Sequence, residues 1–184
     1  MRELSLNVLD IAQNSIVAGA SLIEIEVTLN YAADLLRIVI RDNGKGMTPE
    51  QVESVRDPFF TTRTTRKVGM GIPLFKMAAE MTGGTLDISS TVGIGTVVTA
   101  DFHISHVDCT PLGDMCSTVC ALIRMNPQLD FIYGYAVDSR SFTVDTRELK
   151  EVLEGVPLDT PDVMLWIQGF ITEQTENILE VSDL

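Results

Sequence analysis

The sequence predicts an α/β fold in which helices and strands alternate. An approximate helical stripe of apolar residues covers residues 3–18. Alternating apolar and acidic residues follow at 23–29, and a β-branched run at 35–42 is bounded by polar residues, as strands are. These segments predict a helix followed by two strands.

A second helix and two further strands are predicted before residue 104. Gly69 and Gly71 precede Pro73, and proline is typical of the first turn of a helix. The next residues supply the apolar face that we expect this helix to bury: Leu74, Met77, Ala78 and Met81. Residues 83–89 and 95–104 have the pattern of strands.

The second half of the chain predicts a small α+β region. We expect a helix at 111–125, strands at 129–137 and 141–145, and helices at 146–154 and 160–180. Because about 80 residues bury little core on their own, this region is expected to pack against the first half or a second subunit. The predicted domains are residues 1–104 and residues 105–184.

The composition favours a cytoplasmic protein with a protein partner. No apolar run approaches the roughly 20 residues of a membrane span, and the first residues lack a signal-peptide pattern. Of the net charge of −13, residues 1–104 carry −3 (9 Lys+Arg, 12 Asp+Glu) and residues 105–184 carry −10 (4 and 14). Such acidity repels nucleic acid and anionic membranes and suits a basic partner, although it equally suits solvated helices.

Three cysteines lie close together, and two readings of them stay open. Cys116 and Cys120 are one helical turn apart and Cys109 is near in sequence, so they can be metal or redox ligands. Buried reduced thiols are the commoner outcome in a chain without a secretory signal.

Three short motifs, NSIVAGA at 14–20, DNGKGM at 42–47 and VGMGIPLFKM at 68–77, together predict one nucleotide pocket. Asp42 ends a predicted strand, where a fixed carboxylate suits the exocyclic amine of adenine. Glycines beside it let the backbone turn and leave room for a flat ligand. A simple Asx-type turn is the alternative for Asp42 alone.

The segment at 57–69 predicts a phosphate-binding lid. Arg63, Arg66 and Lys67 lie among hydroxyl side chains without apolar periodicity, so they can meet phosphate oxygens. The free amides at the helix start near Gly71 form an anion site. A solvated loop is the alternative for the basic cluster.

Residues 2–104 resemble the ATP-binding domain of the GHKL superfamily, which sensor histidine kinases, DNA gyrase, MutL, Hsp chaperones of that class and anti-sigma serine kinases share. The resemblance rests on the three motifs and their order. It implies a two-layer α+β sandwich, with a mixed β-sheet covered by helices on one face and a Bergerat-type ATP pocket.

The resemblance also implies roles for individual residues. Asn14 corresponds to the magnesium-coordinating asparagine and Asp42 to the adenine reader. Gly44 and Gly46 shape the first glycine box, and Thr96 matches the threonine near the base.

The remaining implied contacts lie around the lid and the second glycine box. Phe59 and Phe60 belong to the aromatic box. In a kinase reading of the pocket, Arg63, Arg66 and Lys67 steady the γ-phosphate. Gly69 and Gly71 start the helix on the phosphate side.

One position departs from the family pattern. Many members have a catalytic glutamate four residues before the magnesium asparagine, whereas this chain has Asp10, with a side chain one methylene shorter. One helical turn still places Asp10 and Asn14 on one face. Glu3 and Asn7 repeat the spacing one register earlier, but the motif that follows Asn14 favours the later pair.

These residues predict an ATP-binding protein that uses magnesium. Because no helix pair carrying an acceptor histidine precedes residue 1, we expect a protein kinase acting in trans on a partner, with Asp10 assisting the acceptor. An ATP-sensing regulatory module and a slow ATP hydrolase are the alternatives. A homodimer is compatible with each.

Overall fold

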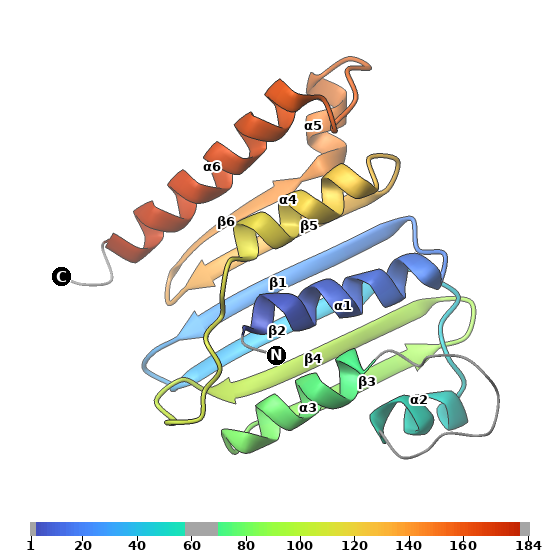
Figure 1. The fold of residues 1–184 in the computed structure, drawn as a ribbon, viewed down its shortest axis with the longest axis vertical. Helices are drawn as coiled ribbons and strands as arrows, with labels where there is room; N and C mark the ends of the chain where they lie inside the picture. Colours follow the sequence, from blue (N-terminus) through green and yellow to red (C-terminus); the bar gives the residue numbers. More distant parts are fainter. Residues whose placement is uncertain (1–2, 58–69, 181–184) are drawn as a thin grey trace.

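The computed structural model describes residues 3–57 and 70–180 and contains one mixed β-sheet (Figure 1). Its strands are β1 (Leu22–Asn30), β2 (Leu35–Asp42), β3 (Thr85–Thr91), β4 (Gly95–His103), β5 (Asp130–Val137) and β6 (Arg140–Asp145). They lie in the order β3-β4-β2-β1-β5-β6. The sheet is mixed because β1 pairs antiparallel with β2 and parallel with β5.

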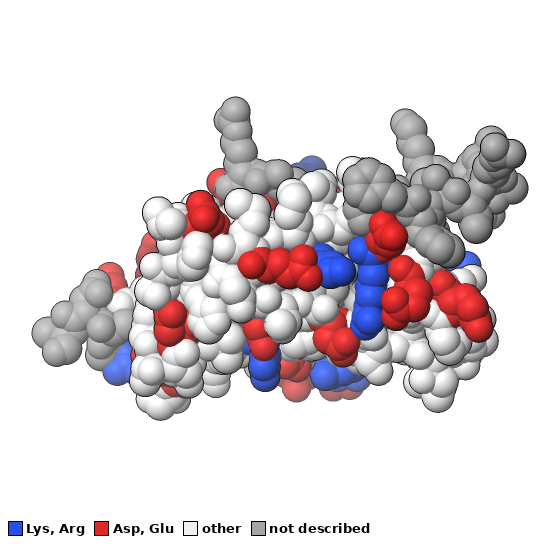
Figure 2. Space-filling view, turned by 90° about the horizontal axis from the view of Figure 1, so that it is seen from below, with Lys and Arg blue, Asp and Glu red and all other residues white. Residues whose placement is uncertain are grey.

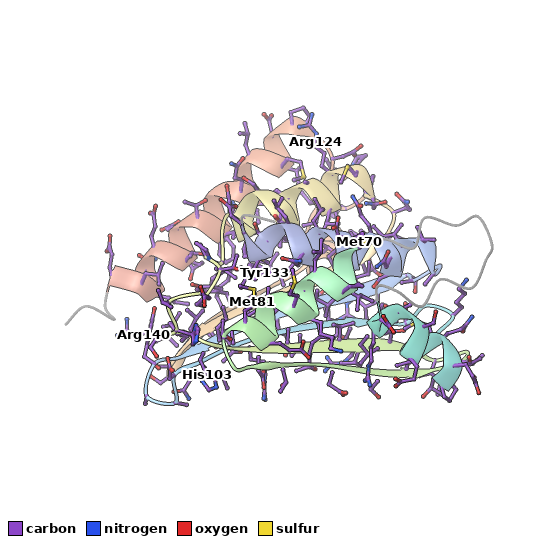
Figure 3. All side chains as sticks on the ribbon, turned by 60° about the horizontal axis from the view of Figure 1, so that its bottom comes forward. Met70, Met81, His103, Arg124, Tyr133 and Arg140 are labelled. Atoms are coloured by element: carbon purple, nitrogen blue, oxygen red, sulfur yellow. The ribbon has the colours of Figure 1, made fainter. Side chains whose placement is uncertain are left out.

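Helices form the second layer. They are α1 (Leu4–Val17), α2 (Pro49–Arg56), α3 (Gly71–Met81), α4 (Met115–Met125), α5 (Thr146–Val152) and α6 (Pro161–Glu180). Helices α1, α3, α4 and α6 lie on one face of the sheet, and Tyr133 lies between the layers (Figure 3). The predicted α+β sandwich is therefore confirmed. Over the described parts of the chain, no helix has the length and apolar character needed to cross a bilayer.

Strand alternation explains which side chains form the core. Ile25 on β1 lies opposite Ile40 on β2 and Tyr133 on β5, and all three are buried beneath the helices. The alternate residues of the strands face away from the helices, and several of those on β1, β2 and β4 carry charge. Arg37 binds Asp101 through two hydrogen bonds of 2.7 Å each.

Charges on the first half are largely paired. At the β3 edge of the sheet, Arg56 lies 3.0 Å from Asp87. Lys76 lies 3.8 Å from Glu80 on α3. Seen from this side, basic side chains lie beside acidic ones (Figure 2).

The second half of the chain joins the same sheet. Strand β5 covers the edge of β1 that β2 leaves open, and β6 continues the sheet. The amides of Leu4 and Ser5 at the start of α1 donate to the carbonyls of Pro111 and Leu112, at 2.9 and 2.8 Å. All the strands and helices predicted for this half are present, and the division of the chain at residue 104 stays a prediction.

The apolar face predicted for α3 is partly wrong. The buried residues are Ile72, Phe75 and Ala79, whereas Met77 and Met81 are each 52% exposed. The register is set by Phe75, whose ring packs 5.6 Å from that of Phe102 on β4. The methionines lie on the outer side of the helix because that contact turns them away from the sheet.

Two helix starts also differ from expectation. Helix α2 was not predicted, although Thr48 and Gln51 form a reciprocal capping box at its start. Helix α4 begins at Met115 rather than at residue 111, because Asp114 caps it by accepting the amide of Ser117 at 2.8 Å. The carbonyl of Pro111 is already bonded to α1.

Candidate nucleotide site

A pocket of about 390 Å³ lies between α1, α2 and the adjoining ends of β2 and β4. This volume is within the range of roughly 300–1,000 Å³ that is common for small-molecule sites. Aliphatic and polar side chains both line it, and the predicted residues Asn14, Asp42, Gly46 and Thr96 are among the lining residues. Four predicted site residues from three separate segments therefore surround one pocket.

Asp42 is held in place by two hydrogen bonds. The Ser15 hydroxyl donates to Oδ2 of Asp42 at 2.6 Å, and the amide of Gly44 donates to Oδ1 at 2.9 Å. Ser15 is only 3% exposed. Because each carboxylate oxygen accepts more than one hydrogen bond, Asp42 still has acceptor capacity for a ligand. The Asx-type contact with Gly44 thus coexists with a pocket role instead of replacing it.

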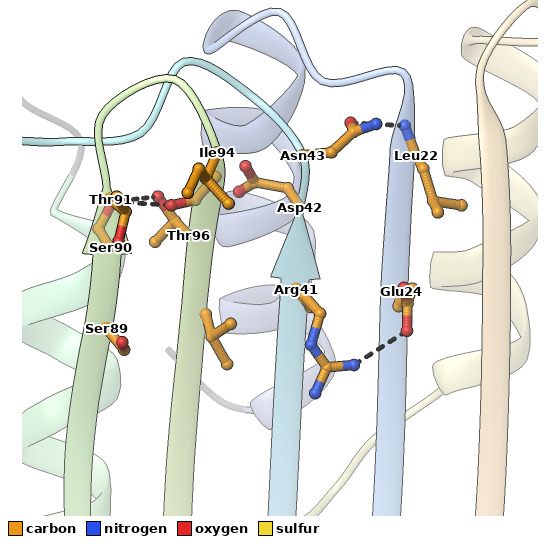
Figure 4. A pocket seen from close by; sticks show the side chains of 12 residues that line it. Leu22, Glu24, Arg41, Asp42, Asn43, Ser89, Ser90, Thr91, Ile94 and Thr96 are labelled. Atoms are coloured by element: carbon orange, nitrogen blue, oxygen red, sulfur yellow. Dashed lines mark hydrogen bonds and ion pairs between the residues drawn. The ribbon is translucent and has the colours of Figure 1, made fainter.

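Thr96 lies beside Asp42 at the end of the sheet. The two residues are partners across the β2–β4 pair, and Figure 4 shows their side chains on neighbouring strands. The Thr96 hydroxyl is 2.8 Å from that of Ser90 on β3, which also accepts the amide of Met47 at 2.8 Å. These bonds connect the turn after β2 to the strands behind it.

Glycine is needed at position 46 because the backbone of Thr91 approaches it closely. Its φ is +69°, and a Cβ at this position would lie 2.0 Å from the carbonyl oxygen of Thr91. The Lys45 carbonyl also accepts the Gly93 amide at 2.8 Å. The turn that follows Asp42 is therefore packed against the β3–β4 hairpin, which fixes the turn as one wall of the pocket.

Helix α1 carries the other predicted polar groups. Asn14 is exposed and lines the pocket, whereas Asn7 is only 2% exposed and does not line it. Asp10 is half-buried one turn before Asn14. A Cβ on Gly71 would lie 2.9 Å from Cβ of Asp10, so the start of α3 closely approaches this carboxylate. The structure therefore places Asn14, and not Asn7, at the pocket.

Comparison with known proteins identifies the family. The profile described as histidine kinase-, DNA gyrase B-, and HSP90-like ATPase matches residues 1–106. The chain belongs to this ATPase family. The match contains all of the predicted site residues.

Two relatives match between a half and three fifths of the chain. A putative sensor histidine kinase NtrY-like of Rickettsia conorii is 29% identical over 108 residues, which are 59% of this chain and 18% of the relative. The non-motile and phage-resistance protein of Caulobacter vibrioides is 30% identical over 96 residues, 50% of this chain and 11% of the relative. The chain thus spans about a fifth or less of the length of these relatives.

A solved structure of the N-terminal domain of a DNA repair protein has the same fold. It superposes with a TM-score of 0.55 at 16% identity, over 79% of this chain and 52% of that one. This coverage is wider than the family match, and it supports the fold alone.

Six of the predicted contacts cannot be placed in this ATPase-family pocket. They fall outside the residues that the structure describes: Phe59, Phe60, Arg63, Arg66, Lys67 and Gly69. Their roles stay predictions. Among the residues that are described, Gly71 borders Asp10, and the next residue, Ile72, lines the pocket.

Several pocket residues were missed in the sequence. Ser15 lies in the NSIVAGA motif but was given no role of its own, although it directly follows Asn14 and bonds to Asp42. Gln51 and Ser54 line the pocket from α2. The sequence TPEQ at 48–51 has the threonine and glutamine of a capping box, which would have predicted the helix that presents them.

The opposite side of the same sheet end has a hollow of about 340 Å³, shown in Figure 4. Asp42 and Thr96 border it as well, but its outer part contains Arg41, which lies 2.9 Å from Glu24. Because Arg41 is already paired, it is a weaker anion contact than a free cation would be. The pocket on the helix side has the aliphatic walls that a base needs, so it is the better nucleotide site.

Cys116 and Cys120 lie on α4 where it packs against α6, whereas Cys109 lies between β4 and α4; none of the three lines the Asp42 pocket. The Cys116 thiol is 3.5 Å from the Thr172 hydroxyl. A hydrogen bond from Cys120, followed by that of Thr172, lowers the pKa of Cys116 to about 6, and the pKa of Cys120 is raised by the same bond and by burial. All three cysteines are free thiols. Among the described residues, no three potential ligands converge on a metal site.

Proposed function

We propose that this chain binds Mg-ATP in the Asp42 pocket and transfers the γ-phosphoryl group to a partner protein in trans. The observation that carries the proposal is the convergence of Asn14, Asp42, Gly46 and Thr96 on one pocket of suitable volume. Family membership supports the nucleotide. The Rickettsia conorii relative is named a putative sensor histidine kinase, and this name supports phosphoryl transfer.

The hydrogen-bond acceptor and the apolar residues of the pocket fit an adenine base. The Asp42 carboxylate is anchored by Ser15 and Gly44, so it accepts the exocyclic amine without first having to be ordered. Ile40 and Val98 lie on the same sheet face beside it and supply apolar contact to the flat ring. A base with a carbonyl at that position, as in guanine, would place two acceptors against each other.

Asn14 and Asp10 are proposed to act at the phosphates. The Asn14 amide oxygen is a ligand type that Mg²⁺ accepts, with phosphate oxygens and water completing the shell. Bound Mg²⁺ would neutralise charge on the transferred group. Asp10 would then hold or accept the proton of the attacking group, directly or through one water because its side chain is short.

A non-catalytic ATP sensor is the second candidate. The helix that carries Asn14 also contacts the second half of the chain, because the amides of Leu4 and Ser5 donate to the carbonyls of Pro111 and Leu112. A ligand that shifts α1 would therefore alter those contacts. Slow hydrolysis of ATP without a partner is a third outcome.

The net charge of −13 favours a protein partner over nucleic acid for the kinase and for the sensor. We propose a cytoplasmic location.

Calorimetry with ATP, with and without magnesium, tests the common part of these proposals. Asn14→Ala should abolish the magnesium-dependent gain in affinity and spare some magnesium-free binding. Asn177→Ala, the same substitution at an exposed residue of α6 that does not line the pocket, is the matched control. Absence of ATP binding by the wild type would contradict every candidate.

Labelled ATP then distinguishes the candidates. We expect the wild type, added to an extract of its own host, to transfer γ-³²P to a protein, and Asp10→Asn to lose that transfer. ATP binding without transfer or hydrolysis, together with changed hydrogen exchange in residues 105–180, would instead favour the sensor. Phosphate release without a labelled protein would favour the hydrolase.

A further inference from the structure

An apolar groove lies between α5 and α6, in the half of the chain that the family match does not cover. Its volume is about 330 Å³. Apart from Asp162, its lining is wholly apolar: Leu149, Val152, Leu153, Val163, Trp166 and Ile167. Helix α5 packs beside β5, whereas α2 packs beside β3 at the opposite edge of the sheet (Figure 1). The groove is therefore distinct from the Asp42 pocket.

Large apolar side chains at this groove are open to solvent. Val152 is 80% exposed and Trp166 is 56% exposed. The neighbouring Leu165, on the other side of α6, is 68% exposed. Exposed apolar side chains that line one groove together are typical of a protein-interaction site.

Trp166 is held in position for a contact. Its ring stacks on that of Phe170 at 5.5 Å and 14°, and Phe170 in turn packs edge-on against Phe142 of β6. The indole is therefore fixed against the core on one side and available on the other. Tryptophan in such a position is the residue type most enriched at interface hot spots.

The charges that the structure describes around the groove are mostly acidic and unpaired, which favours a basic partner. Residues 146–180 contain eight acidic and two basic residues. Both basic residues are already neutralised by strand carboxylates, since Arg147 lies 2.7 Å from Asp145 and Lys150 lies 2.7 Å from Asp130. Among the described residues, none of the eight acidic side chains forms an ion pair, in contrast to the paired charges at the β3 edge.

We propose that this groove binds a basic amphipathic segment of another protein, with apolar side chains against Trp166 and Val152 and Lys or Arg beside Glu148, Glu151 and Asp162. The three carboxylates lie next to or within the lining of the groove. A second copy of this chain is a poorer occupant, because two chains of net charge −13 repel each other. A groove between two helices suits the apolar face of a third.

The test uses two labelled peptides and the full chain. One peptide, LKKLLKLLKKLLKL, has an apolar helical stripe with lysine on its other face, and the second has glutamate at each lysine. Anisotropy gives the affinities, and the emission of Trp166, the single tryptophan, reports contact at the groove. We expect the lysine peptide to bind at least about 100-fold more tightly than the glutamate peptide and to shift the Trp166 emission to shorter wavelength.

Matched variants locate the binding. Val152→Asp should weaken the lysine peptide at least tenfold, whereas Val107→Asp, at a residue that is 92% exposed and outside the groove, should not. The triple variant Glu148→Gln, Glu151→Gln, Asp162→Asn should weaken binding and flatten its salt dependence. The same change in net charge further along α6, made by replacing Glu173, Glu176 and Glu180 with Gln, should have a smaller effect.

Four results would overturn the proposal. They are absence of binding, equal binding of the two peptides, equal effects of the two triple variants, and an unchanged affinity in Val152→Asp. Sedimentation that reveals a dimer dissociated by Val152→Asp would also overturn it, because a second copy would then be the occupant.

Discussion

Replacing Asp42 with asparagine alters the pocket at a single group while keeping its shape. The side-chain oxygen of the new amide can still accept the Gly44 amide, as Oδ1 of Asp42 does at 2.9 Å. Its nitrogen takes the place of Oδ2 and can donate to the Ser15 hydroxyl, which then turns to the Ile11 carbonyl at 3.4 Å. The fold therefore retains its hydrogen bonds, but the pocket gains a donor where it had a charged acceptor.

The loss in affinity follows from this change. A hydrogen bond to a charged group contributes about 1.5–3 kcal/mol, and adenine would present its own donor to the new one. Since about 1.4 kcal/mol of binding free energy corresponds to a tenfold change in Kd, the Kd for ATP should rise by roughly 10- to 150-fold. The free energy of unfolding should change by less than about 1 kcal/mol, which is roughly 2–4 °C in Tm for a chain of this length.

Calorimetry with ATP and GTP on both proteins measures the effect, and thermal unfolding checks the fold. The wild type should prefer ATP by orders of magnitude, because its site is built to pair a polar edge. Asp159→Asn provides the same charge change at an exposed site. If the Kd for ATP is unchanged in the Asp42→Asn variant, or if the wild type binds GTP equally well, Asp42 does not read adenine.

Three further changes test other features. Ser15→Ala should weaken ATP about fivefold by releasing the pocket carboxylate, and calorimetry showing no change would mean that the hydroxyl does not orient it. Gly46→Ala should lower the free energy of unfolding, measured in urea, by more than about 1 kcal/mol. Gly93→Ala is the control, because Gly93 has a φ of +79° but nothing lies within 4 Å of its added Cβ, so only backbone strain should lower its stability. Equal losses of stability in the two variants would refute the proposed clash. Cys116 should be alkylated by iodoacetamide at a rate that is flat above pH 7 and falls as the pH drops through about 6, because its thiolate is protonated there. Mass spectrometry should find that Cys120→Ala slows this reaction at pH 7, since the bond that lowers the pKa is lost, and an unchanged rate would contradict that cause.

Sequence patterns predicted most of the fold because the strands alternate cleanly. Residues 23–29 and 35–42 differ from β1 and β2 by at most one residue at either end. The sequence could not show that β5 lies parallel to β1, because the residues that pair, such as Ile25 and Tyr133, are more than a hundred positions apart. Local periodicity carries no information on such contacts.

The site was predicted where a motif specifies backbone geometry. Gly46 needs its positive φ and its contact with Thr91, and this need is visible as a glycine in the sequence. The role of Ser15 was not visible, since a serine on an apolar helix stripe is usually a tolerated small residue. Only the fold reveals that its hydroxyl is 2.6 Å from Asp42.

The parallel pairing of β1 and β5 has a consequence for how the chain folds during synthesis. Until residues 130–137 have been made, β1 presents an unpaired edge of amides and carbonyls beside the nucleotide-binding half. Pairing across such a long stretch of sequence is slow to form, and an open edge of this kind promotes aggregation. We therefore expect a nascent chain that ends near residue 104 to depend on chaperones or early ligand binding, even though the family-specific motifs are already present in it.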